Sequence, residues 1–401
     1  MKALRHFHFF FYLEKNVIFR PFVDNFLKTV GCLNCVQYVS SILEIMKSNF
    51  QNAQQANLPG DYFHSIRTKD KFDLFDLLSI DPTGIKNDIN KQKDYIGQKE
   101  RPLFKINDDE YFVLYFNYLC NSLFTGLVFS FYEKSGITKL YKSFPDFKTI
   151  IGTEYSEYIL FRGLVKTCFA GKNVILKFAE KGDCAINPDC YYRKGNDIFL
   201  IEFKDNLLAA KAIQSGSFDA IKASIDEKFI QNSRKAKGIS QISRLIQEMS
   251  NQDVPFDNIF LKQKRRNISV YPVIIHTNFY FQFPGINEYL NEEFQKKIEP
   301  FKKTFKTIKP LTLININFLY KNLLSFKKEE LDISELINRY AKIINKKRKK
   351  ATNSGSIDDY IDASISFDEI SNGKIGYNAI YKDNKHLQEV YGCLDMPDYH
   401  S

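Results

Sequence analysis

Three side chains that could act together on a phosphate group are Asp189, Glu202 and Lys204. Side chains alternate between the two faces of a strand, so Glu202 and Lys204, two residues apart, are expected on the same face. If a turn at Gly195 pairs their strand with the preceding one, Asp189 lies beside Glu202. Two carboxylates and one ammonium would then share one patch at the end of an apolar strand.

Such a patch is suited to hydrolysis of a phosphodiester. Two neighbouring carboxylates repel each other unless a cation lies between them. Mg²⁺ prefers oxygen ligands, keeps several waters, neutralises phosphate charge and lowers the pKa of a bound water. A nearby lysine can orient that water or stabilise the negative charge that develops. The alternative is a surface aspartate and an exposed Glu/Lys pair, since a lone Glu-x-Lys occurs by chance in most proteins.

Helices and strands predicted from residue 152 onward would position these side chains. Thr153 is a candidate cap for a helix that ends near Phe169. A polar stretch over 215–237 leads into the helix expected at 239–249. Residues 311–318 are a candidate for an additional strand. Apolar runs and turn residues predict three strands, a helix and a strand over residues 174–179, 185–192, 198–203, 239–249 and 269–276. The order predicts an α/β fold with a mixed sheet flanked by helices.

The segment Pro188-Asp189 followed by Glu202-Phe203-Lys204 resembles the signature of the PD-(D/E)XK nuclease superfamily. The element order over residues 152–280 is similar to the restriction-endonuclease-like core of that superfamily. The resemblance implies that Asp189 and Glu202 are metal ligands, that the backbone carbonyl of Phe203 completes the site, and that Lys204 is the catalytic lysine. It also implies Mg²⁺ as the cofactor, with Mn²⁺ able to replace it.

Members of this superfamily often add an acidic residue from the first core helix and a glutamine from the second. Glu157 is the preferred candidate because it lies at the edge of the apolar face of its helix. Glu154 lies in the first turn of the expected helix, where the helix dipole stabilises any carboxylate. Gln241 fits the position of the glutamine, and a solvated helix residue is the alternative. Asp205 should point away from the metal.

The charge of the chain favours a polyanionic partner. Lys and Arg number 57 against 47 Asp and Glu, which gives a net charge of +10. No apolar run is long enough to cross a bilayer, so no membrane partner is expected. The seven cysteines are an odd number and widely spread, which favours the reducing cytoplasm. The basic stretch over 262–309 is expected to flank the active-site face, because it follows the second core helix and brackets the strand at 269–276. Four of its residues are candidate phosphate contacts in nucleic-acid binding: Lys262, Lys264, Arg265 and Arg266.

Three regions are expected. Residues 1–150 form a mainly helical accessory region that recognises substrate, a protein partner or a second copy of the chain. Residues 151–345 form the nuclease domain, and residues 346–401 form a basic linker with a small acidic appendage. The predicted function is a Mg²⁺-dependent DNA endonuclease, with defence against phage or foreign DNA suggested by analogy. The alternatives are an inactive nucleic-acid-binding or interaction module with the same fold, and an RNase.

Overall fold

The computed structural model describes residues 2–55, 65–67, 73–80, 83, 100–114, 116–123, 125–180, 188–232, 235–374 and 384–394. The chain divides into two compact units, one within residues 1–155 and the other within residues 156–395. The division falls slightly beyond the boundary at residue 150 that the sequence predicts. It places the expected C-terminal appendage, as far as it is described, in the second unit.

The first unit consists mainly of helices and contains a small sheet with strand order β1-β4-β3-β2. Its core is aromatic, with the rings of Phe10 and Phe131 packed against Phe26. The helices are α1 (Lys2–Lys15), α2 (Arg20–Thr29), α3 (Cys35–Gln55), α4 (Asp73–Leu77), α7 (Phe116–Ser122), α8 (Thr125–Lys134) and α9 (Phe144–Ile150). The strands are β1 (Ser65–Arg67), β2 (Ser79–Ile80), β3 (Leu103–Asn107) and β4 (Glu110–Val113).

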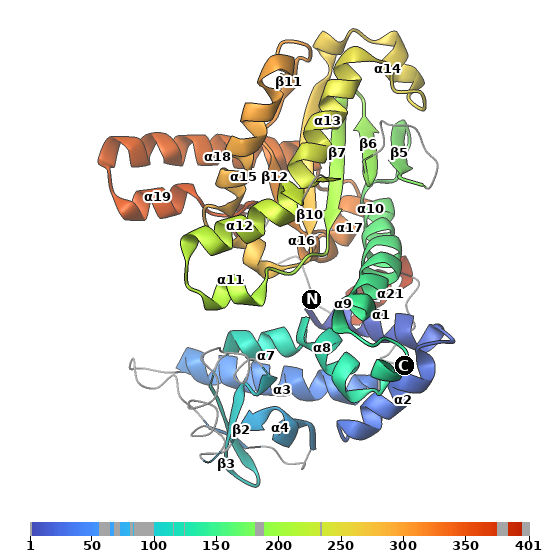
Figure 1. Cartoon of the computed structure of the whole chain (residues 1–401), viewed down its shortest axis with the longest axis vertical. Helices are drawn as coiled ribbons and strands as arrows, with labels where there is room; N and C mark the ends of the chain where they lie inside the picture. The colour runs from blue at the N-terminus through green and yellow to red at the C-terminus, as the bar shows by residue number, and fades with distance from the viewer. Residues whose placement is uncertain are drawn as a thin grey trace. The chain divides into compact units, whose positions relative to one another are not determined.

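The second unit is built on a mixed sheet (Figure 1). Strands β5 (Val174–Phe178), β6 (Cys190–Lys194) and β7 (Asp197–Lys204) pair antiparallel in chain order. Strand β10 (Ser269–His276) then lies parallel to β7, and β12 (Thr312–Asn315) and the short β11 (Thr307–Ile308) lie parallel to β10. The three predicted strands and the later parallel strand are therefore confirmed, although residues 185–187 of the second one lie outside the described residues.

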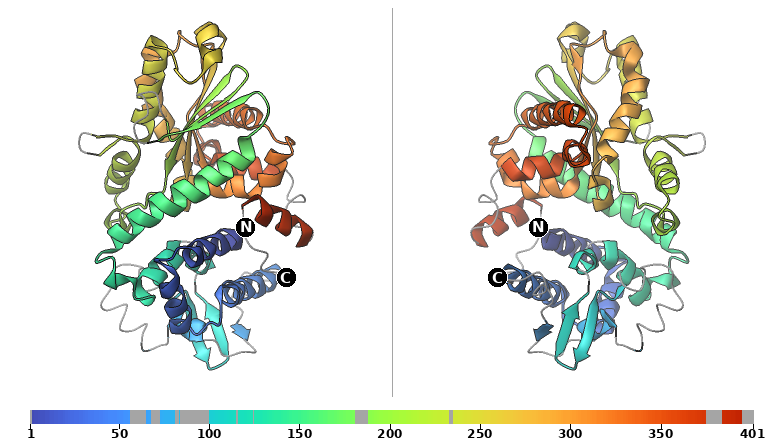
Figure 2. Two further views of the ribbon diagram at one scale, coloured as in Figure 1. Left: turned by 90° about the vertical axis from the view of Figure 1, so that its right-hand side faces the viewer. Right: turned by 90° about the vertical axis from the view of Figure 1, so that its left-hand side faces the viewer.

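Alternate residues of β7 send their side chains to opposite faces, and each face is covered by a helix. Phe203 stacks on Phe161 at the end of η2 (Ile151–Phe161), with the ring centroids 4.7 Å apart. This segment continues into α10 (Arg162–Phe169), which runs along one side of the sheet in Figure 2. The opposite face receives α13 (Gly238–Asn251). Because η2 follows α9 directly, Thr153 lies inside a continuous helical run and does not cap it, which corrects the sequence prediction.

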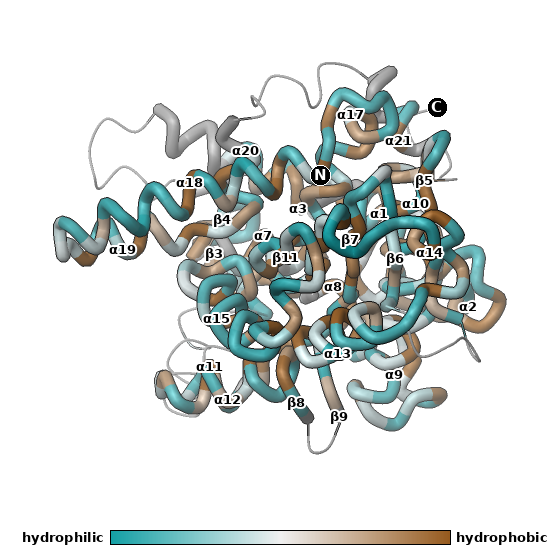
Figure 3. The backbone as a smooth tube through the Cα atoms, turned by 90° about the horizontal axis from the view of Figure 1, so that it is seen from above, coloured by the Kyte–Doolittle hydropathy of each residue, from teal (hydrophilic) through white to brown (hydrophobic). Residues whose placement is uncertain are grey.

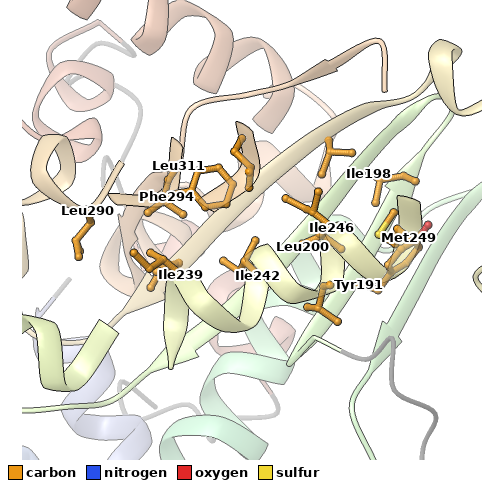
Figure 4. Close-up of a cluster of buried hydrophobic side chains, with 14 of the residues drawn as sticks. Tyr191, Ile198, Leu200, Ile239, Ile242, Ile246, Met249, Leu290, Phe294 and Leu311 are labelled. Carbon is orange, nitrogen blue, oxygen red and sulfur yellow. The ribbon is translucent and has the colours of Figure 1, made fainter. Parts of the chain in front are cut away.

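Helix α13 forms the main hydrophobic core together with β7 and β10. The predicted apolar stripe of this helix is buried, and it meets Ile198 and Leu200 of β7 (Figure 4). Residues of α15 (Ile286–Ile298) close the other side of the cluster, including Leu290 and Phe294. The five residues of the α13 stripe are Ile239, Ile242, Leu245, Ile246 and Met249. Burial of each such side chain contributes on the order of 1.5–3 kcal/mol to folding.

Three segments differ from the sequence prediction. The polar stretch 215–237 contains a helix, α12 (Phe218–Phe229), whose Ile225 and Phe229 are buried. The additional strand is limited to β12, because the side chain of Asn315 accepts the backbone N–H of Asn317 and begins helix α16 (Ile316–Lys321). The basic linker is part of helix α18 (Ile333–Ser354), which continues through residues 346–350.

Helix α18 is amphipathic, with hydrophilic and hydrophobic segments alternating along its tube in Figure 3. Most of its apolar side chains are buried. Helix α19 (Ile357–Ala363) returns beside it and brings acidic side chains to the basic run. Lys347 pairs with Asp362 at 3.2 Å, and Lys350 pairs with Asp359 at 2.6 Å. The second unit also contains α11 (Ala210–Gln214), α14 (Asn258–Lys262), α17 (Leu323–Lys327), α20 (Phe367–Lys374) and α21 (Asn384–Cys393).

A buried ion pair connects β6 to α14. Arg193 Nη1 lies 2.7 Å from Asp257 Oδ2, and both side chains are almost fully buried. The hydroxyl of Tyr191 donates to the same carboxylate oxygen at 2.6 Å. The other oxygen accepts the backbone N–H groups of Ile259 and Phe260 and caps α14. Breaking a buried pair by neutralising one partner leaves the other charge buried without compensation.

We therefore expect Asp257→Asn to lower the free energy of unfolding by about 3–5 kcal/mol, as measured by urea denaturation. Asp253→Asn is the matched control, because Asp253 is 59% exposed where it meets Arg265. Exposed pairs of that kind contribute about 0–1 kcal/mol. Equal unfolding midpoints for the two variants would contradict a structural role for the buried pair.

Candidate active site

The predicted acidic residues meet at the carboxyl end of β7. Strands β6 and β7 pair from Lys194 beside Asp197 to Cys190 beside Ile201. One further step of this antiparallel register places Asp189 opposite Glu202. On the other side of β7, the parallel partner of Lys204 is His276, the last residue of β10. The site therefore lies where the ends of three strands come together.

Glu202 and Lys204 form a buried ion pair at this edge. Lys204 Nζ lies 2.9 Å from Glu202 Oε2, and Glu202 is only 2% exposed. The same ammonium donates to Gln241 Oε1 of α13 at 3.2 Å. That amide oxygen also accepts the backbone N–H of Gly238 at 2.7 Å. The structure thus brings Gln241 to the site, as the sequence analysis expects, and uses it to hold the ammonium.

Asp189 is half-buried and fixed by the backbone. Its Oδ2 accepts the N–H of Phe203 at 2.7 Å, and its own carbonyl accepts the N–H of Ala179 at 3.3 Å. The first bond joins the aspartate to β7 between Glu202 and Lys204. Asp205, the next residue after Lys204, accepts the hydroxyl of Thr277 instead. Its contact agrees with the expectation that it points away from the site.

The two candidate glutamates of the first helix have different partners. Glu154 accepts a hydrogen bond from the hydroxyl of Tyr12 at 2.8 Å, which gives it a structural role in the first unit. Glu157 is partly exposed, and its Oε1 lies 3.9 Å from Arg162 Nη2. The pKa of Glu157 is raised, first by burial and then by the charge of Asp189, while Arg162 and Lys204 oppose this rise. Glu157 therefore belongs to the electrostatic environment of Asp189.

Arg162 is a residue of the site that the sequence analysis missed. Its guanidinium donates to the carbonyl of Ala179 at 2.7 Å and lies 4.7 Å from the ring centroid of Tyr158 and 5.4 Å from that of Phe178. A helical period of 3.6 residues would place Arg162 and Glu157 on different sides. The wider winding of η2, with hydrogen bonds between residues five apart, brings them near each other. The sequence shows a positive charge five residues after Glu157, but this spacing brings the two side chains together only in a helix wound as widely as η2.

The charges of the cluster shift one another. Burial, followed by the neighbouring Asp189, raises the pKa of Glu202 to about 8, and Lys204 opposes this rise. Burial lowers the pKa of Lys204, but the carboxylates of Glu202, Asp189 and Glu157 outweigh that effect and raise it overall. The lysine is therefore held in its charged form by an excess of acidic groups. Strongly perturbed groups gathered at one edge are typical of functional sites.

The donor set suits a hard cation in its chemistry. Asp189 and Glu202 offer carboxylate oxygens, and Phe203, the residue directly after Glu202, offers its backbone carbonyl. In the part of the chain that the structure describes, however, no three His, Cys, Asp or Glu side chains are grouped closely enough to hold a metal ion. Glu202 is instead paired with Lys204, and Asp189 with a backbone N–H. Binding a cation would require these two carboxylates to turn from their present partners.

The basic cluster expected to contact nucleic acid lies elsewhere. Lys262, Lys264, Arg265 and Arg266 precede Ser269, which pairs with Asp197 at the start of β7. They therefore lie at the amino end of β10, about 23 Å along the sheet from its carboxyl end. Arg265 is also engaged locally, because it donates to the carbonyl of Met249 at 2.8 Å. The expectation that this cluster flanks the catalytic edge is wrong, because β10 is parallel to β7. Its contact with nucleic acid stays a prediction.

No family model, curated protein or solved structure matches this chain. None of the helices in the described residues has the length and apolar character needed to cross a membrane.

A raised carboxyl pKa predicts a particular pH dependence of stability in EDTA. Between about pH 4.5 and pH 8, Glu202 binds a proton more tightly in the native state than in the unfolded state. The free energy of unfolding should therefore fall as the pH rises, by up to about 1.4 kcal/mol per pH unit. Glu202→Gln has no carboxyl group to titrate, so the difference in stability between the two proteins should shift in favour of the variant as the pH rises through that range.

The measurement is urea unfolding of both proteins at a series of pH values. Titrating groups outside this cluster contribute equally to the two proteins, so the difference between the two curves reports on Glu202 and the groups coupled to it. A constant difference from pH 4.5 to pH 8 would show that Glu202 is ionised throughout.

Proposed function

We propose that this chain is a Mg²⁺-dependent nuclease with a PD-(D/E)XK-like core in its second unit. Support comes from the antiparallel strands β5, β6 and β7, the parallel strand β10, and the helices on the two faces of the sheet. This arrangement is similar to the core that the sequence resemblance implies. The observation that carries the proposal is the buried Glu202–Lys204 pair opposite Asp189 at the end of the central strand.

A structural role explains that pair poorly. Desolvating a carboxylate and an ammonium costs several kcal/mol per ion, which a hydrophobic pair would avoid. The four strand residues before Glu202, at 198–201, are apolar and buried, so the charges follow directly on an apolar run. The cluster also contains more acidic than basic groups, which favours binding of a cation. A bound cation would in turn attract a phosphate. Charged groups that lower the stability of the surrounding core in this way are typical of functional sites.

Each residue has a role in the proposed reaction. Asp189, Glu202 and the carbonyl of Phe203 would hold the Mg²⁺, which supplies charge neutralisation for the phosphate and an acidified water. Lys204 stays charged beside the carboxylates and stabilises the negative charge that develops on the phosphate. Gln241 holds the ammonium from α13 and limits the orientations it adopts.

Asp189→Asn and Lys204→Met should each lower the rate of cleavage by about a hundredfold or more, since each removes a charge that acts on the transition state. Initial rates are measured on plasmid DNA, single-stranded DNA and RNA, with Mg²⁺, with Mn²⁺ and with EDTA. The control is Asp253→Asn, which removes an exposed carboxylate and should cleave like wild type. Cleavage by either site variant at the wild-type rate would contradict the assignment, as would cleavage that persists in EDTA.

Glu157→Gln should slow cleavage, because Glu157 is electrostatically coupled to Asp189 and Lys204. The matched control on the same helix is Glu154→Gln. Glu154 is hydrogen-bonded to Tyr12, so this variant should alter thermal stability more than activity. The two variants are compared for initial rate and melting temperature. Equal, small effects on rate would show that the first helix contributes no group to the reaction.

A further inference from the structure

An exposed group of aromatic rings follows the strand that lies beside Lys204. The group, called here the aromatic platform, consists of Phe279, Tyr280 and Phe283. Phe279 is 39% exposed and Phe283 is 51% exposed. The rings of Phe279 and Tyr280 are stacked with centroids 4.2 Å apart, and both meet Phe283 edge-on, at 6.0 Å and 5.5 Å. Three aromatic rings therefore lie together with part of their surface open to solvent.

The intervening side chains of the same turn point inward. Phe281 is 1% exposed and packs edge-on against Phe229 of α12, with centroids 4.6 Å apart. Gln282 interacts with the buried carboxylate of Asp368. These two residues anchor the short helix η4 (Phe279–Gln282) to the core. The exposure of Phe279 and Phe283 is thus a feature of an anchored turn.

A backbone hydrogen bond and a side-chain hydrogen bond connect this turn to the end of β7 at the candidate active site. The N–H of Thr277 donates to the carbonyl of Lys204 at 3.2 Å. The side-chain amide of Asn278 donates to the carbonyl of Asn206 at 3.4 Å, and its side-chain oxygen accepts the N–H of Tyr280. The ring of His276, fully buried, is 2.9 Å from the carbonyl of Asn278. The platform is therefore held at a fixed place relative to Lys204.

The distance between platform and site suits a short stretch of nucleic acid. Ile274 lies beside Glu202 in the sheet, and Phe279 is five residues further along. Five extended residues span at most about 18 Å. A nucleic-acid strand with a rise of 3.4 Å per nucleotide covers even this upper limit in about five nucleotides. A strand cleaved at the site can therefore reach the platform.

We propose that the aromatic platform stacks on unpaired bases, so that the substrate of this site is single-stranded or locally unwound nucleic acid. The inference rests on the proposed nuclease function. Exposed aromatic rings bind bases by stacking without regard to sequence. In a duplex the base faces are already stacked on one another, so only an unpaired strand offers them. The net charge of +10 favours such a polyanion over an apolar partner surface.

The test compares binding of fluorescein-labelled single-stranded DNA, single-stranded RNA and duplex DNA by fluorescence anisotropy in EDTA. The double variant Phe279→Leu/Phe283→Leu keeps apolar side chains and removes two rings. It should bind single strands at least about fivefold more weakly than wild type, with duplex binding unchanged. The double variant Phe279→Tyr/Phe283→Tyr keeps the rings and should retain wild-type affinity. Comparison of the DNA and RNA arms shows which strand is preferred.

The matched control is Phe218→Leu, which removes a ring that is 77% exposed at the start of α12. It should bind every probe like wild type. The inference is overturned if the double leucine variant binds single strands like wild type, if it loses duplex and single-strand binding equally, or if wild type binds no nucleic acid. A platform that serves a protein partner gives the first of these results.

The same proteins separate this inference from the proposed function. Cleavage with Mg²⁺ by wild type, together with unchanged single-strand binding by the leucine variant, overturns the platform and leaves the nuclease standing. Ring-dependent binding of single strands without cleavage overturns the nuclease and supports the platform as a binding site.

Discussion

The buried pair of Glu202 and Lys204 is the constraint on which the second unit depends. Two charges at the end of a central strand are stable only if neighbouring elements supply polar partners. Asp189 comes from the end of the adjacent strand, and Gln241 from the helix above it. Glu157 adds a further negative charge from the helix on the other face. The pairing of the strands and the positions of the two helices around β7 therefore all bring polar or charged groups to the Glu202–Lys204 pair.

Side chains alternate between the two faces of β7, so this one strand can pack on apolar helices and also carry the polar residues of the site. Phe203 continues the apolar face that packs on η2. Glu202 and Lys204 continue the face that begins with Ile198 and Leu200 and packs on α13. This helix begins at Gly238, where φ is +40°, and an added Cβ would lie 2.7 Å from the carbonyl oxygen of Phe229. Glycine thus lets α13 start close enough for Gln241 to reach the lysine.

Part of this arrangement could be predicted from the sequence, because the physics involved is local. The apolar runs predict the strands β7 and β10. The period of two along a strand predicts that Glu202 and Lys204 share a face. The turn at Gly195 predicts that the two strands pair and that Asp189 lies beside Glu202. Helix α13 followed from its stripe of apolar residues. These features depend on neighbours in the sequence or on one hairpin.

The rest depends on tertiary geometry. The position of the basic cluster at 262–266 follows from the parallel direction of β10, which no local pattern specifies. Arg162 reaches Glu157 only because η2 is wound more widely than an ordinary helix. Helix α12 has few buried residues in a polar sequence, so its apolar face was too sparse to predict. The anchoring of the aromatic platform by Asn278 and Phe281 likewise becomes visible only when the strand ends are in place.

The most direct test of the central claim is a crystal structure of the full chain soaked in Mn²⁺, with anomalous scattering used to locate the metal. We expect a peak coordinated by the carboxylates of Asp189 and Glu202 and the carbonyl of Phe203, with Lys204 beside the metal ligands. The absence of a peak there, with Lys204 still paired to Glu202 and Mn²⁺ bound at another site, would contradict it.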